Sequence, residues 1–333
     1  MSIRRPIIAL LVLAAMAAGC AVDATQEANY SQNRVLKAWI KVNHPGARLF
    51  GENGVYILDM DNGSGAAVTD SCYVWAHYTK KSLDQTISST NIRELSEQLG
   101  NYSNKSYYGS RIWRIDQGYL PNGLEEVMKT MRAGGHATIA LPIDAQSHDY
   151  SMYDAFSGVS GSDNQIIEFT IDTLVTDVYA WQDRTMREWF FRNYAVADTL
   201  LEHLYLKKLV EKTEEADTVA QGATVNVRYI GRLMDGMVFD TNIEDTAKFY
   251  RIYNSGNSYQ ALTITYYKDD FSQLEDDNSV VKGFARAVSK MNYGEKAVTL
   301  FRSDLGYGEE GSSPSIPEYC PLVFWLYVEP KDI

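Results

Sequence analysis

VVKGFARAVSKMNYGEKAVTLFRSDLGYG, residues 280–308, is the stretch of sequence that decides the fold. Four of its apolar residues have the spacing i, i+3, i+4, i+7 that marks one face of a short helix: Phe284, Ala287, Val288 and Met291. Gly294 is expected to end that helix, and residues 297–301 alternate as a strand does. The pattern predicts a helix packed across a sheet with a small apolar cavity between them. A strand–helix–strand core without a cavity would show the same local pattern.

The N-terminus has the pattern of a signal peptide over residues 1–19. Arg4 and Arg5 precede a short apolar run that ends near Ala18, too short for a permanent membrane span. The following Cys20 completes a sequence that resembles the bacterial lipobox, which predicts cleavage before a lipid-modified Cys20. Ordinary signal cleavage that leaves Cys20 free is the alternative. We expect a lipid-anchored protein of the bacterial cell envelope, facing the periplasm or the cell surface, with residues 20–49 as a lipidated tether and short helix.

Composition excludes several classes of function. Without residues 1–19 the chain has 29 Lys and Arg against 43 Asp and Glu, a net charge of −14, which argues against nucleic acid as a partner. The sequence has no C-x-x-C motif and no His/Cys cluster, so we predict no metal site and no cofactor. The remaining cysteines, Cys72 and Cys320, are interpreted as two separate thiols, with an interdomain disulfide as the alternative.

The chain also contains an internal duplication. Residues 76–91 align with residues 227–242 without a gap, and residues 123–141 align with residues 283–301 in the same way. Tyr78 meets Tyr229, and Asn91 meets Asn242. We therefore expect two related domains, and a long apolar-striped segment between them that is helical. The expected boundaries are 50–178 for the first domain, 179–203 for the connecting helix and 204–333 for the second domain.

Three motifs of the second copy resemble the FKBP family of peptidyl-prolyl cis/trans isomerases. They begin at Val227 (VRYIGRLMDGMVFD), at Val280 (VVKGF, followed by Met291 and Gly294) and at Leu305 (LGYG, followed by an Ile-Pro pair and L-V-F). The motifs occur in the family's order, and the resemblance covers about residues 203–330. With its two copies and its lipobox, the chain resembles the tandem-domain exported lipoproteins of this family.

The resemblance implies an α+β fold with two FKBP-like domains, each an antiparallel sheet curved around a short helix, joined by a long helix. It also implies a pocket between helix and sheet, lined by Tyr229, Phe239, Asp240, Val281, Phe284, Tyr307, Ile316 and Phe324. Leu262 and Ile264 are weaker candidates. In the family's pattern Tyr307 would donate its hydroxyl to a peptide carbonyl, the Val281 N–H would bind a second carbonyl, and Asp240 would orient neighbouring polar groups. Phe284 stands where the family usually has tryptophan.

The first copy departs from this pattern. Ser88 and Ser89 align with the Phe-Asp pair, and Leu124 aligns with Phe284, whereas Tyr78 and Phe169 keep aromatic side chains. Tyr150 and Tyr153 are nearby candidates for the position of Tyr307. We expect a related fold without isomerase activity, which serves as a scaffold, a contact in a homodimer or a client-binding surface.

The implied function is peptidyl-prolyl cis/trans isomerisation that assists the folding of exported proteins, with the active site in the C-terminal domain. The expected partners are proline-containing polypeptide clients and a membrane that holds the lipid on Cys20. The alternative is a non-catalytic peptide-binding or chaperone module with a vestigial pocket.

Overall fold

A computed structural model describes residues 29–115, 118, 120–146, 163–268, 270–277 and 279–331. The predicted signal peptide, Cys20, Tyr150 and Tyr153 lie outside these residues. Two compact units are present. Unit 1 contains the described residues up to Ile92 and those from Trp113 to Leu174, and unit 2 contains Arg93–Ile112 and the described residues from Val175 onward. No helix in the described part of the chain is both long and apolar enough to cross a membrane.

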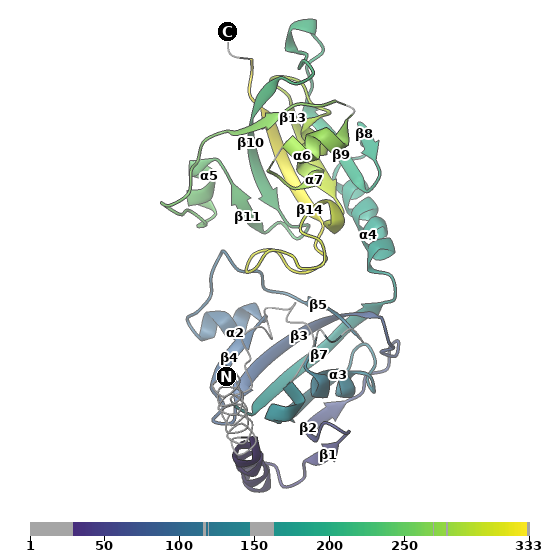
Figure 1. Ribbon diagram of the computed structural model, residues 1–333, viewed down its shortest axis with the longest axis vertical. Helices are drawn as coiled ribbons and strands as arrows, with labels where there is room; N and C mark the ends of the chain where they lie inside the picture. The colour runs from purple at the N-terminus through teal and green to yellow at the C-terminus, as the bar shows by residue number, and fades with distance from the viewer. Residues whose placement is uncertain are drawn as a thin grey trace, which may run out of the picture. The chain divides into compact units, whose positions relative to one another are not determined.

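Unit 2 is built on a seven-stranded antiparallel sheet (Figure 1). The strand order is β8-β9-β13-β14-β10-β11, and β12 pairs with β10. The strands are β8 Thr199–Leu201, β9 Leu204–Val210, β10 Thr224–Arg232, β11 Val238–Thr241, β12 Leu262–Thr265, β13 Lys296–Phe301 and β14 Leu322–Val328. The helices are α2 Arg93–Gln98, α4 Val178–Asn193, α5 Glu244–Phe249, α6 Phe271–Asp277 and α7 Lys282–Val288, with short 3-10 turns η2 Glu215–Asp217 and η3 Ser303–Leu305.

The predicted helix-and-strand unit is confirmed as α7 followed by β13. The four residues of the expected apolar face are all buried, at 2% exposure or less. The helix ends earlier than predicted, at Val288, because the chain tightens there into turns in which Lys290 N–H and Met291 N–H bond to carbonyls three residues back. Gly294, with φ of +75°, belongs to the turn that leads into β13 rather than to the helix end.

Both faces of β13 are covered. Ala297 and Phe301 pack in the core cluster that contains α7, whereas Val298 and Leu300 pack against Met186 and Phe190 of α4. The sheet therefore carries α7 on one face and α4 on the other, which explains why a strand predicted from alternation is apolar at nearly every position.

The predicted helix over residues 176–203 is shorter in the structure. It begins after Asp177, whose carboxylate accepts the Ala180 N–H at 2.9 Å, and it ends at Asn193. The last part of the predicted helix forms β8, which pairs with β9 through a tight turn at His203, where φ is +59°. Apolar residues recur at helical spacing beyond Asn193 because Leu201 of β8 is also partly buried against the core of unit 2.

Unit 1 repeats the topology of unit 2. Its sheet order is β1-β2-β6-β7-β3-β4, with β5 paired to β3, so each strand has a counterpart at the same place in the sheet of unit 2. The helix α3 corresponds to α7 (Figure 1). The elements are β1 Arg48–Phe50, β2 Val55–Asp61, β3 Tyr73–Ser82, β4 Ile87–Thr90, β5 Arg111–Arg114, α3 Asn122–Met128, β6 His136–Leu141, η1 Ile143–Gln146 and β7 Gln165–Val175. A helix over residues 29–43 precedes them.

A buried asparagine repeats the same hydrogen bonds in both units. Asn242 Oδ1 accepts the Tyr229 N–H at 2.9 Å, and its Nδ2 donates to the Val227 carbonyl at 2.8 Å. Asn91 makes the equivalent bonds to Tyr78 N–H and the Ala76 carbonyl, at 2.7 and 2.9 Å. These contacts follow the predicted alignment of residues 76–91 with 227–242, so the duplication is confirmed at the level of individual atoms.

A stacked pair of tyrosine rings is also repeated in the structure, and the sequence analysis did not predict it. The rings of Tyr102 and Tyr108 stack with centroids 5.2 Å apart, and those of Tyr253 and Tyr259 stack at 5.3 Å. In each case the second tyrosine hydroxyl accepts a backbone N–H, from Ser103 or from the residue that follows Tyr253. The first of these loops lies in residues 93–112, which the sequence analysis placed in the first domain and which cluster with unit 2.

The two cysteines in the described part of the chain are free. Cys72 is buried and Cys320 is half-buried, so the interpretation as separate thiols is confirmed. Burial raises the pKa of the Cys72 thiol.

The asparagine contacts generate a stability prediction. Asn242→Ala leaves the Tyr229 N–H and the Val227 carbonyl buried without their partner, so we expect unit 2 to lose about 1–3 kcal/mol of unfolding free energy. Asn91→Ala should do the same to unit 1. Urea unfolding combined with hydrogen exchange resolves the two units. Asn257→Ala, at an exposed position, is the control, and equal effects of all three substitutions would contradict the prediction.

Candidate active site

A cavity of about 480 Å³ lies between α7 and the sheet of unit 2. Its lining is formed by Tyr229, Phe239, Asp240, Leu262, Ser279, Val280, Val281, Phe284, Tyr307 and Phe324. Seven of the eight residues predicted for the pocket, and the weaker candidate Leu262, are therefore brought together. A larger cavity, of about 640 Å³, shares only Tyr229 with the predicted set, so we place the candidate site in the smaller one.

Ile316 and Ile264 do not line the cavity. Both are buried in the core cluster of unit 2 that also contains Phe284 and Phe324. A pair of backbone hydrogen bonds between Ser312 and Ile316 closes a turn there, and it leaves Ile316 only 3% exposed. In this structure Ile316 supports the cavity from behind.

The cavity is an aromatic box. The ring of Phe324 meets the rings of Phe284 and Phe239 edge to face, with centroids 5.2 and 5.5 Å apart. The Tyr229 ring meets Phe284 in the same way at 5.5 Å. Such edge-to-face contacts add to the stabilisation that burial provides and hold each ring in one orientation. The box therefore presents rigid apolar walls.

One hydrogen-bonded pair supplies polarity inside this box. The Tyr229 hydroxyl donates to Asp240 Oδ2 at 2.7 Å, and Asp240 Oδ1 accepts the Thr241 N–H at 2.8 Å. Burial, with the negative charge of Asp240 and this hydrogen bond, raises the pKa of Tyr229 well above its usual range. Tyr229 therefore stays protonated and keeps Asp240 oriented.

Two hydrogen-bond donors lie at the cavity. Val281 is the N-cap residue of α7, a place where backbone N–H groups have no carbonyl partner within the helix. Tyr307 is 41% exposed, and burial of the rest of the side chain together with Asp240 raises its pKa. The Tyr307 hydroxyl therefore remains a donor at neutral pH.

Residues 93–112 contribute contacts that sequence reasoning missed. The Tyr107 N–H donates to the Pro314 carbonyl at 2.8 Å, and Arg111 makes a two-pronged ion pair with Glu318 at 2.7 and 2.9 Å. Glu318 is 1% exposed. These contacts hold the loop that follows Tyr307. The Tyr-, Ser- and Asn-rich composition of residues 93–112 is that of an ordinary connection, so it carried no signal of this role.

Among the described residues, the equivalent place in unit 1 differs at the helix N-cap, at the carboxylate and at one aromatic wall. Pro121 occupies the N-cap position of α3, as Val281 does for α7, and proline has no N–H. The Tyr78 hydroxyl meets Ser89 at 3.0 Å where Tyr229 meets Asp240. Strand register pairs Ile139 with Ile167 and Thr299 with Phe324. Ile167 therefore stands at the position of Phe324, and Phe169 lies two residues further along β7.

Comparisons with known proteins agree with this geometry. Residues 215–328 match the family model described as FKBP-type peptidyl-prolyl cis-trans isomerase. The chain is 30% identical over 118 residues to FK506-binding protein 1A of Aspergillus fumigatus, which covers 35% of this chain and 86% of that protein. The chain belongs to the FKBP family of peptidyl-prolyl cis-trans isomerases. The matched FKBP region contains every residue that lines the cavity.

Two further comparisons gave weaker similarities. A probable FKBP-type peptidyl-prolyl cis-trans isomerase of Haemophilus influenzae is 28% identical over 125 residues, 37% of this chain, and the chain spans only 42% of that protein's length. The crystal structure of the three FKBP domains of wheat FKBP73 aligns with 86% of this chain and 98% of its own at 19% identity and a TM-score of 0.30.

Gly231 offers a test of the aromatic box. A Cβ at this position would lie 2.6 Å from Phe239 Cζ and 3.0 Å from Phe324 Cε1. Gly231→Ala should therefore push the Phe239 ring out of place, cost about 1–3 kcal/mol of stability and weaken binding of a proline-containing peptide in an NMR titration. Gly256→Ala, where the nearest atom is 3.5 Å away, is the control. Unchanged peptide affinity in a folded Gly231→Ala protein would contradict this account of the box.

Proposed function

We propose that unit 2 catalyses cis/trans isomerisation of Xaa-Pro peptide bonds in exported polypeptides. The observation that carries the proposal is the cavity in which an aromatic box, the Tyr229–Asp240 pair and the Tyr307 hydroxyl come together. All of these groups lie within residues 215–328, which match the FKBP family model. Proline-containing clients are the substrates of this proposal.

The aromatic box lowers the barrier to rotation by its apolarity. Rotation about an amide C–N bond is resisted by a barrier of roughly 18–20 kcal/mol, because resonance gives that bond partial double-bond character. The resonance form separates charge, and water stabilises it. A proline ring held among Phe239, Phe284 and Phe324 places the preceding amide in dry surroundings. There the planar, charge-separated state loses its solvation, and the twisted state becomes relatively more favourable.

The two donors hold the peptide while its amide turns. The Tyr307 hydroxyl donates to one substrate carbonyl, and the Val281 N–H donates to a second carbonyl. The Asp240 carboxylate is kept in place by Tyr229 and Thr241, so it fixes the polar edge of the box beside the proline ring. None of these steps makes or breaks a covalent bond. Uncatalysed isomerisation takes tens to hundreds of seconds, slow enough to limit the folding of an exported protein.

The proposal assigns the active site to unit 2 alone. Unit 1 keeps the fold, but three of its residues differ from their counterparts in unit 2. Pro121 replaces the Val281 N–H donor, Ser89 replaces the carboxylate of Asp240, and Leu124 replaces the ring of Phe284. We propose that unit 1 serves as a scaffold, client-binding or dimer-contact domain. The predicted lipid on Cys20 would keep both units at the membrane of the cell envelope, where newly exported chains fold.

Isomerase activity is tested on the mature chain, residues 20–333, with a proline-containing peptide. Tyr307→Phe removes one hydrogen bond that stabilises the bound peptide, and Asp240→Val removes the oriented carboxylate. We expect each to lower kcat/KM about tenfold, since about 1.4 kcal/mol corresponds to a factor of ten. Ser89→Val, at the position in unit 1 that matches Asp240, should leave the rate unchanged.

The same assay separates the two functions. A folded wild-type chain that does not accelerate the peptide would overturn the isomerase proposal. If that chain still bound proline peptides and suppressed aggregation of an unfolded client, the non-catalytic module would replace it. Loss of activity in Ser89→Val would instead move the site to unit 1.

The proposed anchor has its own test. Cys20→Ser removes the thiol that would carry the lipid, so the protein should move from the membrane fraction to the soluble fraction of a bacterial host that processes lipoproteins. Metabolic labelling with a fatty acid should mark the wild-type chain but not the variant. Membrane retention of an unlabelled Cys20→Ser protein would refute the anchor.

A further inference from the structure

The turn that carries Tyr307 is organised by one carbonyl oxygen. Ser303, the first residue of η3, accepts the Gly306 N–H at 2.8 Å and the Gly308 N–H at 2.7 Å. The two residues on either side of Tyr307 are therefore bonded to the same atom. Any shift of Ser303 moves the backbone from which the Tyr307 side chain reaches the cavity.

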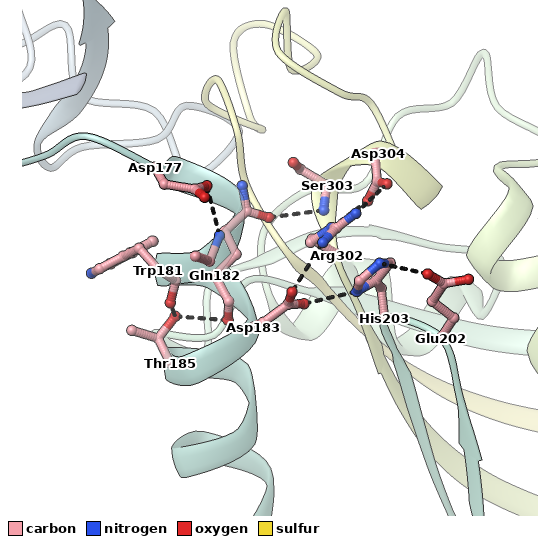
Figure 2. A network of polar contacts seen from close by, with 11 residues as sticks. Asp177, Trp181, Gln182, Asp183, Thr185, Glu202, His203, Arg302, Ser303 and Asp304 are labelled. Carbon is pink, nitrogen blue, oxygen red and sulfur yellow. Dashed lines mark hydrogen bonds and ion pairs between the residues drawn. The ribbon is translucent and has the colours of Figure 1, made fainter. Parts of the chain in front are cut away.

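Ser303 is held in turn by a residue that is distant in sequence. Gln182 of α4 accepts the Ser303 N–H on its Oε1 at 3.0 Å (Figure 2). Both residues have no exposed surface. Water cannot replace this bond, so its loss would leave the Ser303 N–H buried without an acceptor.

An ion network reinforces the same connection. Arg302 donates from Nη1 to Asp183 of α4 at 3.0 Å, and from Nε and Nη2 to Asp304 at 2.9 and 2.8 Å (Figure 2). The hydrogen bond from Arg302 holds the pKa of Asp304 below its ordinary value. The opposite oxygen of Asp183 meets His203 Nδ1 at 3.0 Å. Arg302, which precedes Ser303, is thus bound to α4, and Asp304, which follows Ser303, is bound to Arg302.

The helix itself cannot move freely. Met186 and Phe190 are fully buried against Val298, Leu300 and Val323 of β13 and β14. The Trp189 Nε1–H donates to the Met234 carbonyl at 2.8 Å, in the turn between β10 and β11. The helix α4 therefore contacts both chain segments that bring polar groups to the cavity, the β10–β11 hairpin with Asp240 and the turn with Tyr307.

We propose that Gln182 is a positioning residue of the isomerase site, which acts on the substrate through Ser303 and Tyr307. The helix α4 then helps to position a residue of the active site, although it lies outside residues 215–328, which match the family model. The inference rests on the proposed isomerase function of unit 2, and it adds a residue that the family motifs do not contain.

A double-mutant cycle on the mature chain tests this. Gln182→Met keeps the size of the side chain and removes the acceptor, and Tyr307→Ala removes the group to be positioned. We expect Gln182→Met to lower kcat/KM about five- to tenfold, and to have no further effect in the Tyr307→Ala background. Equal losses in both backgrounds would overturn the proposal, because they would show that Gln182 acts independently of Tyr307. Glu188→Met, at an exposed position of the same helix, is the matched control.

A second measurement does not depend on activity. Gln182→Met should speed amide hydrogen exchange at Gly306 and Gly308 and leave exchange at Val298 and Leu300 in β13 unchanged. If the wild-type chain proves inactive, the proposed function fails, and the exchange data still decide whether Gln182 fixes the turn. Unchanged exchange at both glycines would overturn the proposal. Should Gln182→Met fail to fold, Asp183→Ala, which frees Arg302 from α4, is expected to change exchange at the two glycines in the same direction.

Discussion

A single buried amide in each unit holds the strand arrangement on which the rest of the fold depends. Asn242 joins the end of β11 to two backbone groups of β10, and the Thr241 hydroxyl adds a bond to the Tyr229 carbonyl at 2.6 Å. Because these bonds are buried, exchange with water cannot compensate for their loss. They set the register that puts Asp240 opposite Gly231. The carboxylate then meets the Tyr229 hydroxyl, and Phe239 reaches Phe324.

The same constraint explains how two copies of one scaffold can differ in function. Asn91 preserves the strand arrangement in unit 1, so the side chains at the rim of the cavity were free to change without loss of the fold. Pro121, Ser89 and Ile167 replace a donor, a carboxylate and an aromatic wall, and each fits the local backbone. The side chains of the site can therefore change while the fold is kept, because the fold depends on buried contacts to the backbone and the site depends on the side chains that line the cavity.

Unit 2 also draws on parts of the chain that lie outside the FKBP match. The helix α4 holds the turn before Tyr307 through Gln182, and Arg111 holds the loop after Tyr307 through Glu318. Glu318, the partner of Arg111, and Ser303, the partner of Gln182, are both buried. An unpaired buried charge or amide is costly, so these contacts fix the two sides of the segment that contains Tyr307.

The sequence by itself determined the class of fold, the duplication and seven of the ten residues that line the cavity, because short apolar periodicities and ordered motifs are local properties of a chain. It did not determine that α4 ends at Asn193, since Leu201 of β8 is also partly buried against the core of unit 2 and so continues the apolar pattern. It did not show which residue of unit 1 stands at the position of Phe324, because only strand register identifies that residue as Ile167. Pairings over long separations were decided by the tertiary structure alone. Gln182 with Ser303 and Arg111 with Glu318 lie 121 and 207 residues apart, and no spacing rule connects a polar side chain to a partner that only folding brings near.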